Sequence, residues 1–211
     1  MNKKEAITIR DNEQYLRQIS KEVDILNDDK LQADIEVLEK YCEEHKVLAM
    51  AAIQLGIPKR IIYLKNTNLE LINQIQVKDS KEEDNYNEKR LLINPKIISK
   101  EGLTEYWEAC ASCLDNMGRV LRPYKIIIEY YDIEGKKQQS IFIGFESTVL
   151  SHEMDHLDGI LHIDIAEEVL EMSREERKIF RQAHGYNIIS KTEDYEMLLN
   201  KHSTKRKIKK K

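Results

Sequence analysis

The residues best suited to chemistry lie in one short segment, His152-Glu153-Met154-Asp155-His156. Two histidines four positions apart project from the same face of a helix, one turn apart, so both imidazoles can bind one metal ion. The glutamate beside the first histidine can take a proton from water at that metal. Because these groups are costly to bury in an apolar helix, the pattern favours a metal site over a structural histidine pair.

A catalytic metal of this type needs a third protein ligand and one position for water. His162 is one candidate, because it completes the HExxHxxGxxH pattern of metzincin proteases. Cys110 is the other, because a thiolate is a strong ligand for zinc or ferrous iron. Cys113 forms a CxxC with Cys110, so a closed structural zinc site with two cysteines and two histidines is a third alternative. Spacing alone does not decide between them.

The chain of 211 residues carries a formal charge of −4, which is unevenly distributed. Residues 201–211 contain seven Lys/Arg and no acid, so residues 1–200 carry −11. No apolar run approaches the roughly 18 residues of a membrane span, and we expect neither membrane nor DNA binding. Residues 1–14 have no apolar signal segment, and three cysteines are too few for a disulfide framework. We therefore expect a cytoplasmic protein.

Hydrophobic spacing predicts the elements that would position these residues. Helices are expected at 12–23, 29–45, 145–157 and 173–183, with a further helix opening at 190–193. Strands are expected at 60–64, 91–98, 120–132 and 138–143, and a mobile loop at 79–90. The helix at 145–157 is apolar on most faces, which indicates a central position. The fold class is α+β, with mixed or antiparallel sheets around a central metal-binding helix.

Three segments together resemble the peptide deformylase family. VLAMAAIQLGI at 47–57 resembles its GhGhAAxQ motif, and EACAS at 108–112 resembles EGCLS, with Arg122-Pro123 at the family's spacing. SHEMDHLDG at 151–159 resembles QHExDHLxG. Motif order and spacing agree with the family over about residues 7–165.

The resemblance implies three protein ligands for one divalent metal ion, namely Cys110, His152 and His156. Fe(II) would be the metal in cells, and Zn, Ni or Co could replace it. Glu153 would act as general base and then general acid, with the Gln54 side chain and the Ala111 backbone N–H stabilising the oxyanion. The substrates would be N-formyl-methionine ends of nascent polypeptides, and formate a product. His162 would be a structural or surface residue.

The resemblance also implies a substrate groove, whose lining residues would be Leu48, Ala49, Glu108, Ala109, Phe145, Thr148 and Val149. Several family glycines are replaced, by Val47, Ala49 and Ala109, and Ser151 replaces a glutamine. Added side chains should crowd the groove, most severely at Val47 if that position requires positive φ. Glu108 and Arg122 could form an ion pair that braces the cysteine strand. We expect a complete catalytic centre with an altered groove.

The domain organisation expected is a catalytic domain at 1–165, a helical extension at 166–200 and a basic disordered tail at 201–211. Multiple lysines in the tail could contact ribosomal RNA through its phosphates. Two alternatives to a deformylase stay open at this point. One is a weak or inactive paralogue that binds peptide ends or ribosomes, and the other is a metalloprotease that uses His162.

Overall fold

The computed structural model describes residues 5–65 and 89–209, with side chains described as far as His202. Its helices are α1 (Ile9–Leu16), α2 (Leu31–Glu44), α4 (Phe145–Leu157), α5 (His162–Ile165), α6 (Arg174–His184) and α7 (Tyr195–Lys209), with short 3-10 turns η1 (Ala52–Leu55) and η2 (Ala111–Cys113). Its strands are β1 (Ala49–Ala51), β2 (Ile61–Lys65), β3 (Lys89–Ala109), β4 (Asn116–Arg122), β5 (Lys125–Tyr131), β6 (Lys137–Ile143), β7 (Glu168–Glu171) and β8 (Asn187–Asp194). The α+β fold class is confirmed. No helix among these residues is long and apolar enough to cross a membrane.

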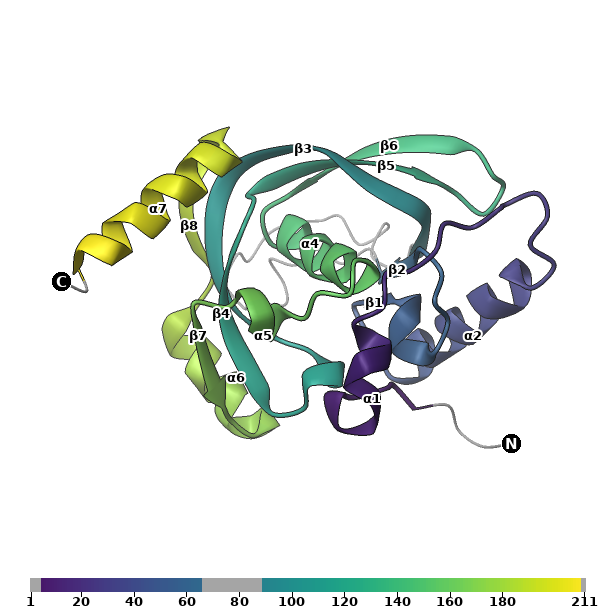
Figure 1. Cartoon of the computed structure of the whole chain (residues 1–211), viewed down its shortest axis with the longest axis horizontal. Coiled ribbons are helices and arrows are strands. Elements are labelled where there is room, and N and C mark those ends of the chain that lie inside the picture. Colours follow the sequence, from purple (N-terminus) through teal and green to yellow (C-terminus); the bar gives the residue numbers. More distant parts are fainter. Residues whose placement is uncertain (1–4, 66–88, 210–211) are drawn as a thin grey trace, which may run out of the picture.

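All eight strands of the described residues join one antiparallel sheet, in which β3 pairs with β2, β4, β5 and β8. The order β1-β2-β3-β4-β7 forms one path, while β5 and β8 pair with other parts of β3, and β6 extends from β5. Register shifts after Ile93 and Ile97, together with a positive φ at Asn94, bend this 21-residue strand. As a result β3 arches around α4, which lies at the centre of the molecule (Figure 1).

The core consists mainly of two clusters on either side of the β1–β2 region. One packs the face of α2 formed by Ile35, Leu38 and Cys42 against β2, as expected from their helical spacing. The other packs the apolar side of α4 against β2, β3, β5 and β6, and includes Leu150 and Leu157, which are fully buried. The second cluster fixes the axis of the central helix relative to the sheet.

Three expected elements differ from the structure. The helix expected at 12–23 ends at Leu16, because backbone groups beyond it bond to distant segments: Ser20 N–H to Leu157 and Lys21 N–H to Pro58. The strand expected at 120–132 is divided between β4 and β5 at Pro123, which lacks an N–H to donate. Residues 190–193 lie in β8, which pairs with β3, rather than opening a helix.

The C-terminal part also differs from the expected helical extension at 166–200 and disordered tail at 201–211. Strands β7 and β8 add to the main sheet, and only α6 opens at the capping box of Ser173 as expected. Helix α7 continues to Lys209, in a segment that has no Gly or Pro and is rich in helix-forming Lys and Arg. Of the loop expected at 79–90, residues 79–88 lie outside the described residues, and Lys89 and Arg90 begin β3.

Gly159 follows the end of α4 and provides a test of this packing. Its φ is +73°, and a Cβ there would lie 2.3 Å from the Arg17 carbonyl oxygen. We predict that Gly159→Ala lowers the free energy of unfolding by more than 2 kcal/mol, because left-handed strain of about 1–2 kcal/mol adds to a backbone clash. Urea denaturation would measure it. Gly56→Ala is the control, since its φ is similar at +76° but the nearest contact is an ordinary 3.7 Å; equal losses would contradict the packing argument.

Candidate active site

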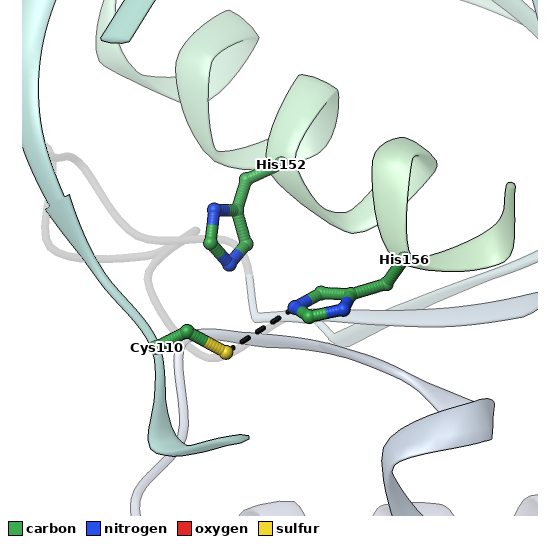
Figure 2. Close-up of side chains that lie close together, drawn as sticks. All are labelled: Cys110, His152 and His156. Atoms are coloured by element: carbon green, nitrogen blue, oxygen red, sulfur yellow. Dashed lines mark hydrogen bonds between the residues drawn. The ribbon is translucent and has the colours of Figure 1, made fainter. Parts of the chain in front are cut away.

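The two histidines of α4 and the cysteine at the end of β3 meet at one point (Figure 2). The ligand atoms of Cys110, His152 and His156 all lie within 4.8 Å of one another, and Cys110 Sγ is 3.2 Å from His156 Nε2. The Cys113 thiol donates a hydrogen bond to Cys110, which together with His156 and His152 lowers the pKa of Cys110 against the opposing effect of burial. A thiolate and two imidazoles thus converge on one site.

His162 and Cys113, the alternative ligands, do not belong to this group. The His162 ring lies 5.5 Å from that of His152, and neither of its nitrogens has a hydrogen-bond partner among the described residues. Burial, with a further contribution from His152, lowers the pKa of His162 to about 4. Cys113 is fully buried and packs with Leu16 and Leu161. The arrangement supports three protein ligands with Cys110 as the third, which leaves a position for water.

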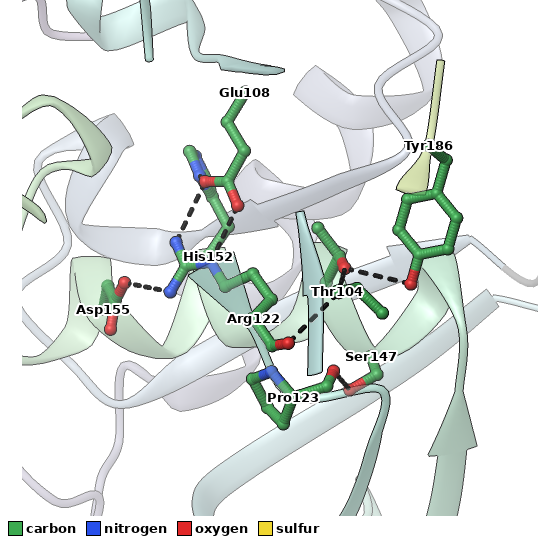
Figure 3. A network of polar contacts seen from close by, with 9 residues as sticks. Thr104, Glu108, Arg122, Pro123, Ser147, His152, Asp155 and Tyr186 are labelled. Carbon is green, nitrogen blue, oxygen red and sulfur yellow. Dashed lines mark hydrogen bonds and ion pairs between the residues drawn. The ribbon is translucent and has the colours of Figure 1, made fainter. Parts of the chain in front are cut away.

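A buried network of charged side chains contacts His152 through its Nδ1 (Figure 3). His152 Nδ1 lies 2.8 Å from Glu108 Oε2, so its Nε2 turns toward Cys110. Both carboxylate oxygens of Glu108 accept from Arg122, at 2.7 and 2.9 Å, and Arg122 also donates to Asp155. Burial alone would raise the pKa of Glu108, but Arg122 and His152 hold it well below its usual range. Such a carboxylate fixes the orientation of an imidazole ligand and increases its basicity.

Glu153 and Gln54 are held next to the ligands by a shared backbone donor. The Ala51 N–H donates to Glu153 Oε2 at 2.7 Å and to Gln54 Oε1 at 3.1 Å. Gln54 Nε2 in turn donates to Cys110 Sγ and to Ser112 Oγ, at 3.2 and 3.1 Å. Burial raises the pKa of Glu153. The site therefore contains a buried carboxylate and, beside Cys110, an amide donor.

A cavity of about 360 Å³ opens at these groups. Every residue expected to line the substrate groove does line it: Leu48, Ala49, Glu108, Ala109, Phe145, Thr148 and Val149. Gln54, Cys110, Ala111, His152 and Glu153 also border it, while His156 is fully buried. The structure thus brings these residues together, and their individual roles remain predictions.

Sequence reasoning missed four residues that line the cavity, Tyr41, Met50, Tyr106 and Arg181. Tyr106 had a usable signal, since it lies two positions before Glu108 and so faces the same side of β3. Tyr41 and Arg181 come from α2 and α6, and no local pattern connects either of them to the motifs.

The replaced glycines do not strain the backbone of the groove. Val47 and Ala109 line the cavity, but neither has a positive φ; the left-handed residue is the neighbouring Lys46, at +53°. Val47 packs against the α2 cluster and Ala49 against the α4 cluster. The condition under which Val47 would be most disruptive is therefore absent.

Comparison with known proteins places these features in a family. The family model for polypeptide deformylase matches residues 6–171. The peptide deformylase of Pelagibacter ubique is 36% identical over 150 residues, covering 71% of this chain and 78% of that protein. That of Finegoldia magna is 33% identical over 167 residues, covering 79% and 90%.

Solved structures agree. A probable peptide deformylase from synechococcus phage S-SSM7 superimposes with a TM-score of 0.62 at 32% identity, covering 77% of this chain and 99% of that one. A peptide deformylase from Synechococcus elongatus, in complex with actinonin, gives a TM-score of 0.64 at 27% identity, with 87% of each chain covered. The chain belongs to the peptide deformylase family.

Proposed function

We propose that this chain hydrolyses the N-formyl group of nascent polypeptides that begin with formyl-methionine, using one divalent metal ion held by Cys110, His152 and His156. Deformylase activity and metal dependence follow from the family. The observation that carries the ligand assignment is the convergence of the three ligand atoms within 4.8 Å, at a cavity that also contains Glu153.

The donor set fits such a metal. A thiolate with two imidazoles suits ferrous iron or zinc, and the lowered pKa of Cys110 favours the thiolate form. We propose Fe(II) as the metal in cells, with Zn, Ni and Co as substitutes. When bound, the ion would polarise the formyl carbonyl and lower the pKa of a water molecule.

The protein groups then carry the proton and the developing charge. Glu153 accepts a proton from the attacking water and later delivers it to the departing amine, so that formamide and water become formate and a free amino terminus. Its raised pKa, caused by burial, suits both steps. Gln54 Nε2 and the backbone N–H of Ala111 donate to the oxyanion; the N–H of Gln54 that otherwise bonds to Cys110 Sγ is the one that turns to it, while the bonds to Ala51 and Ser112 keep Gln54 in place.

The alternatives receive less support from the site. A metzincin-type protease requires His162 as a ligand, and His162 lies outside the group formed by the other three side chains. An inactive paralogue is expected to lose a ligand or the proton-transfer group, whereas Cys110, His152, Glu153 and His156 are all present and close together.

We further propose that the enzyme works in the cytoplasm and that residues 201–211 contact ribosomal RNA. Tyr195 and Leu198 anchor the start of α7 against Leu103 and Leu121. From there the helix runs outward from the body to the C-terminus (Figure 1). Residues 201–211 follow this anchored segment and carry seven Lys/Arg and no acid, a charge that suits sequence-independent binding to phosphates.

The ligand assignment predicts the metal content of two variants. Cys110→Ser should weaken metal binding by at least about tenfold, because a neutral hydroxyl replaces a thiolate. His162→Ala should keep one metal ion per chain. Elemental analysis after anaerobic dialysis would measure both, with thermal melts to verify folding. Metal retained in Cys110→Ser but lost in His162→Ala would support the protease pattern instead.

The role of Glu153 predicts a separation of binding from turnover. Glu153→Gln keeps an acceptor for the Ala51 N–H but cannot take a proton, so we expect unchanged metal content and formate release slower by about 10²–10⁴. A coupled formate assay would measure it. Asp158→Asn is the matched control, because it makes the same change at the half-exposed carboxylate that ends α4 and pairs with Arg60. Turnover close to normal in Glu153→Gln would exclude Glu153 as the base.

The tail hypothesis predicts salt-sensitive ribosome binding. Full-length protein should co-sediment with ribosomes at low salt and be released at high salt, while a 1–200 truncation should not bind. The truncation keeps Tyr195 and Leu198, so the start of α7 retains its packing. A full-length variant with the seven basic residues changed to Gln controls for length. Equal co-sedimentation of all three proteins would contradict the hypothesis.

A further inference from the structure

The residues that line the cavity include one basic residue from the C-terminal part of the chain, Arg181 of α6. The match to the family model ends at residue 171, so this side chain lies after the matched segment. It is the only Lys or Arg among the described residues that line the cavity.

Helix α6 is docked so that Arg181 is held at the cavity. The Arg181 Nε donates to the Trp107 carbonyl at 2.9 Å, and its guanidinium lies over the Tyr106 ring, 5.3 Å from the centroid. One position earlier, Phe180 packs edge-on against Trp107, with centroids 5.0 Å apart. One turn earlier, Arg177 donates to the Leu114 carbonyl at 2.6 Å. These contacts fasten α6 to the end of β3 and orient the guanidinium.

Carboxylates neutralise the other guanidinium charges near the site, but none of the described residues supplies a carboxylate to Arg181. Arg122 pairs with Glu108 and Asp155, and Arg119 pairs with three glutamates. For Arg181, the described residues provide a carbonyl and an aromatic face but no carboxylate within ion-pair distance. A half-buried guanidinium without a carboxylate partner attracts anions. Its planar set of N–H groups matches the two oxygens of a carboxylate.

The acidic groups in the cavity do not supply that partner. Glu108 is already occupied by Arg122 and His152. Glu153 accepts a hydrogen bond from the Ala51 N–H, and no ion pair joins it to Arg181 in the part of the chain that the structure describes. Among the described residues that line the cavity, no carboxylate is therefore available to Arg181, and the carboxylate of a molecule that enters the cavity could pair with it.

We propose that Arg181 binds a carboxylate of the substrate peptide, so that this enzyme prefers formylated peptides with an acidic side chain shortly after the methionine. This inference rests on the proposed function. The Tyr106 ring lies next to both Phe145 and Arg181, since its centroid is 4.9 Å from that of Phe145 and 5.3 Å from the guanidinium. A methionine side chain packed against Phe145, Thr148 and Val149 would leave the residues that follow it within reach of Arg181.

The test compares kcat/KM for C-terminally amidated peptides that differ by one charge: formyl-Met-Ala-Glu against formyl-Met-Ala-Gln, and formyl-Met-Glu-Ala against formyl-Met-Gln-Ala. The wild type should favour the acidic member of at least one pair by roughly fivefold, as expected for a partly exposed ion pair. The preference should shrink at high salt. The free acid of formyl-Met-Ala-Gln shows whether a terminal carboxylate serves equally.

Variants identify the residue responsible. Arg181→Gln should abolish the preference, and Arg181→Glu should reverse it toward formyl-Met-Ala-Lys or formyl-Met-Lys-Ala. A ratio between two substrates on one preparation does not depend on the fraction of active protein. Lys178→Gln removes the same charge from an exposed position of α6 and should leave the ratio as in the wild type.

Two failures can be told apart. Formate release from none of the peptides would contradict the proposed function. Release at equal rates from acidic and neutral peptides, or the same preference in Arg181→Gln as in the wild type, would overturn the role of Arg181 and leave deformylation intact.

Discussion

The active site depends on one buried guanidinium. Arg122 is only 4% exposed and is bonded to Glu108 of β3 and Asp155 of α4. Desolvating these charges is costly, and loss of one partner from such a network typically costs about 3–5 kcal/mol because a buried charge is left uncompensated. Arg122, from β4, therefore ties α4 to two neighbouring strands in a single arrangement. His152 and Cys110 belong to the elements it joins, so the metal site depends on the same bonds.

The register of the sheet explains how Arg122 and Glu108 come to lie beside His152. Thr104, Tyr106 and Glu108 pair with Arg122, Val120 and Gly118 respectively, and strand alternation places all six on the side of the sheet that faces α4. Arg122 lies opposite Thr104 and reaches along the strand to Glu108. Cys110 follows two positions later, where β3 ends. A slip of one residue would turn Glu108 away from His152 and separate the cysteine from both histidines.

His162, the third histidine of the metzincin-like pattern, also has a defined place in this packing. Gly159 adopts a left-handed conformation after α4, and the chain then turns back so that His162 packs behind His152. A Cβ at Gly118 would lie 3.1 Å from His162 Cδ2 and 2.7 Å from Ala166 Cβ. The absence of a side chain in β4 thus makes room for α5. His162 is buried behind His152 and lies outside the group formed by Cys110, His152 and His156, although its spacing in the sequence matches that of a metzincin ligand.

The parts of the fold and the site that the sequence predicted are those whose signal lies within one short segment. Helical spacing in α4 predicted the histidine pair, and the contiguous EACAS motif indicated Cys110 and Glu108. Arg181 and Tyr41 could not be predicted, because their place at the cavity follows from how α6 and α2 dock on the strands. The same holds for β8, whose weak pattern is overridden by pairing with β3. Local propensity decides what a segment can form, whereas the site is completed by partners far away in sequence. A groove with the family motifs in one part of its lining, and in another a helix that lies after the matched family model, can therefore keep its chemistry while its preference for peptides changes.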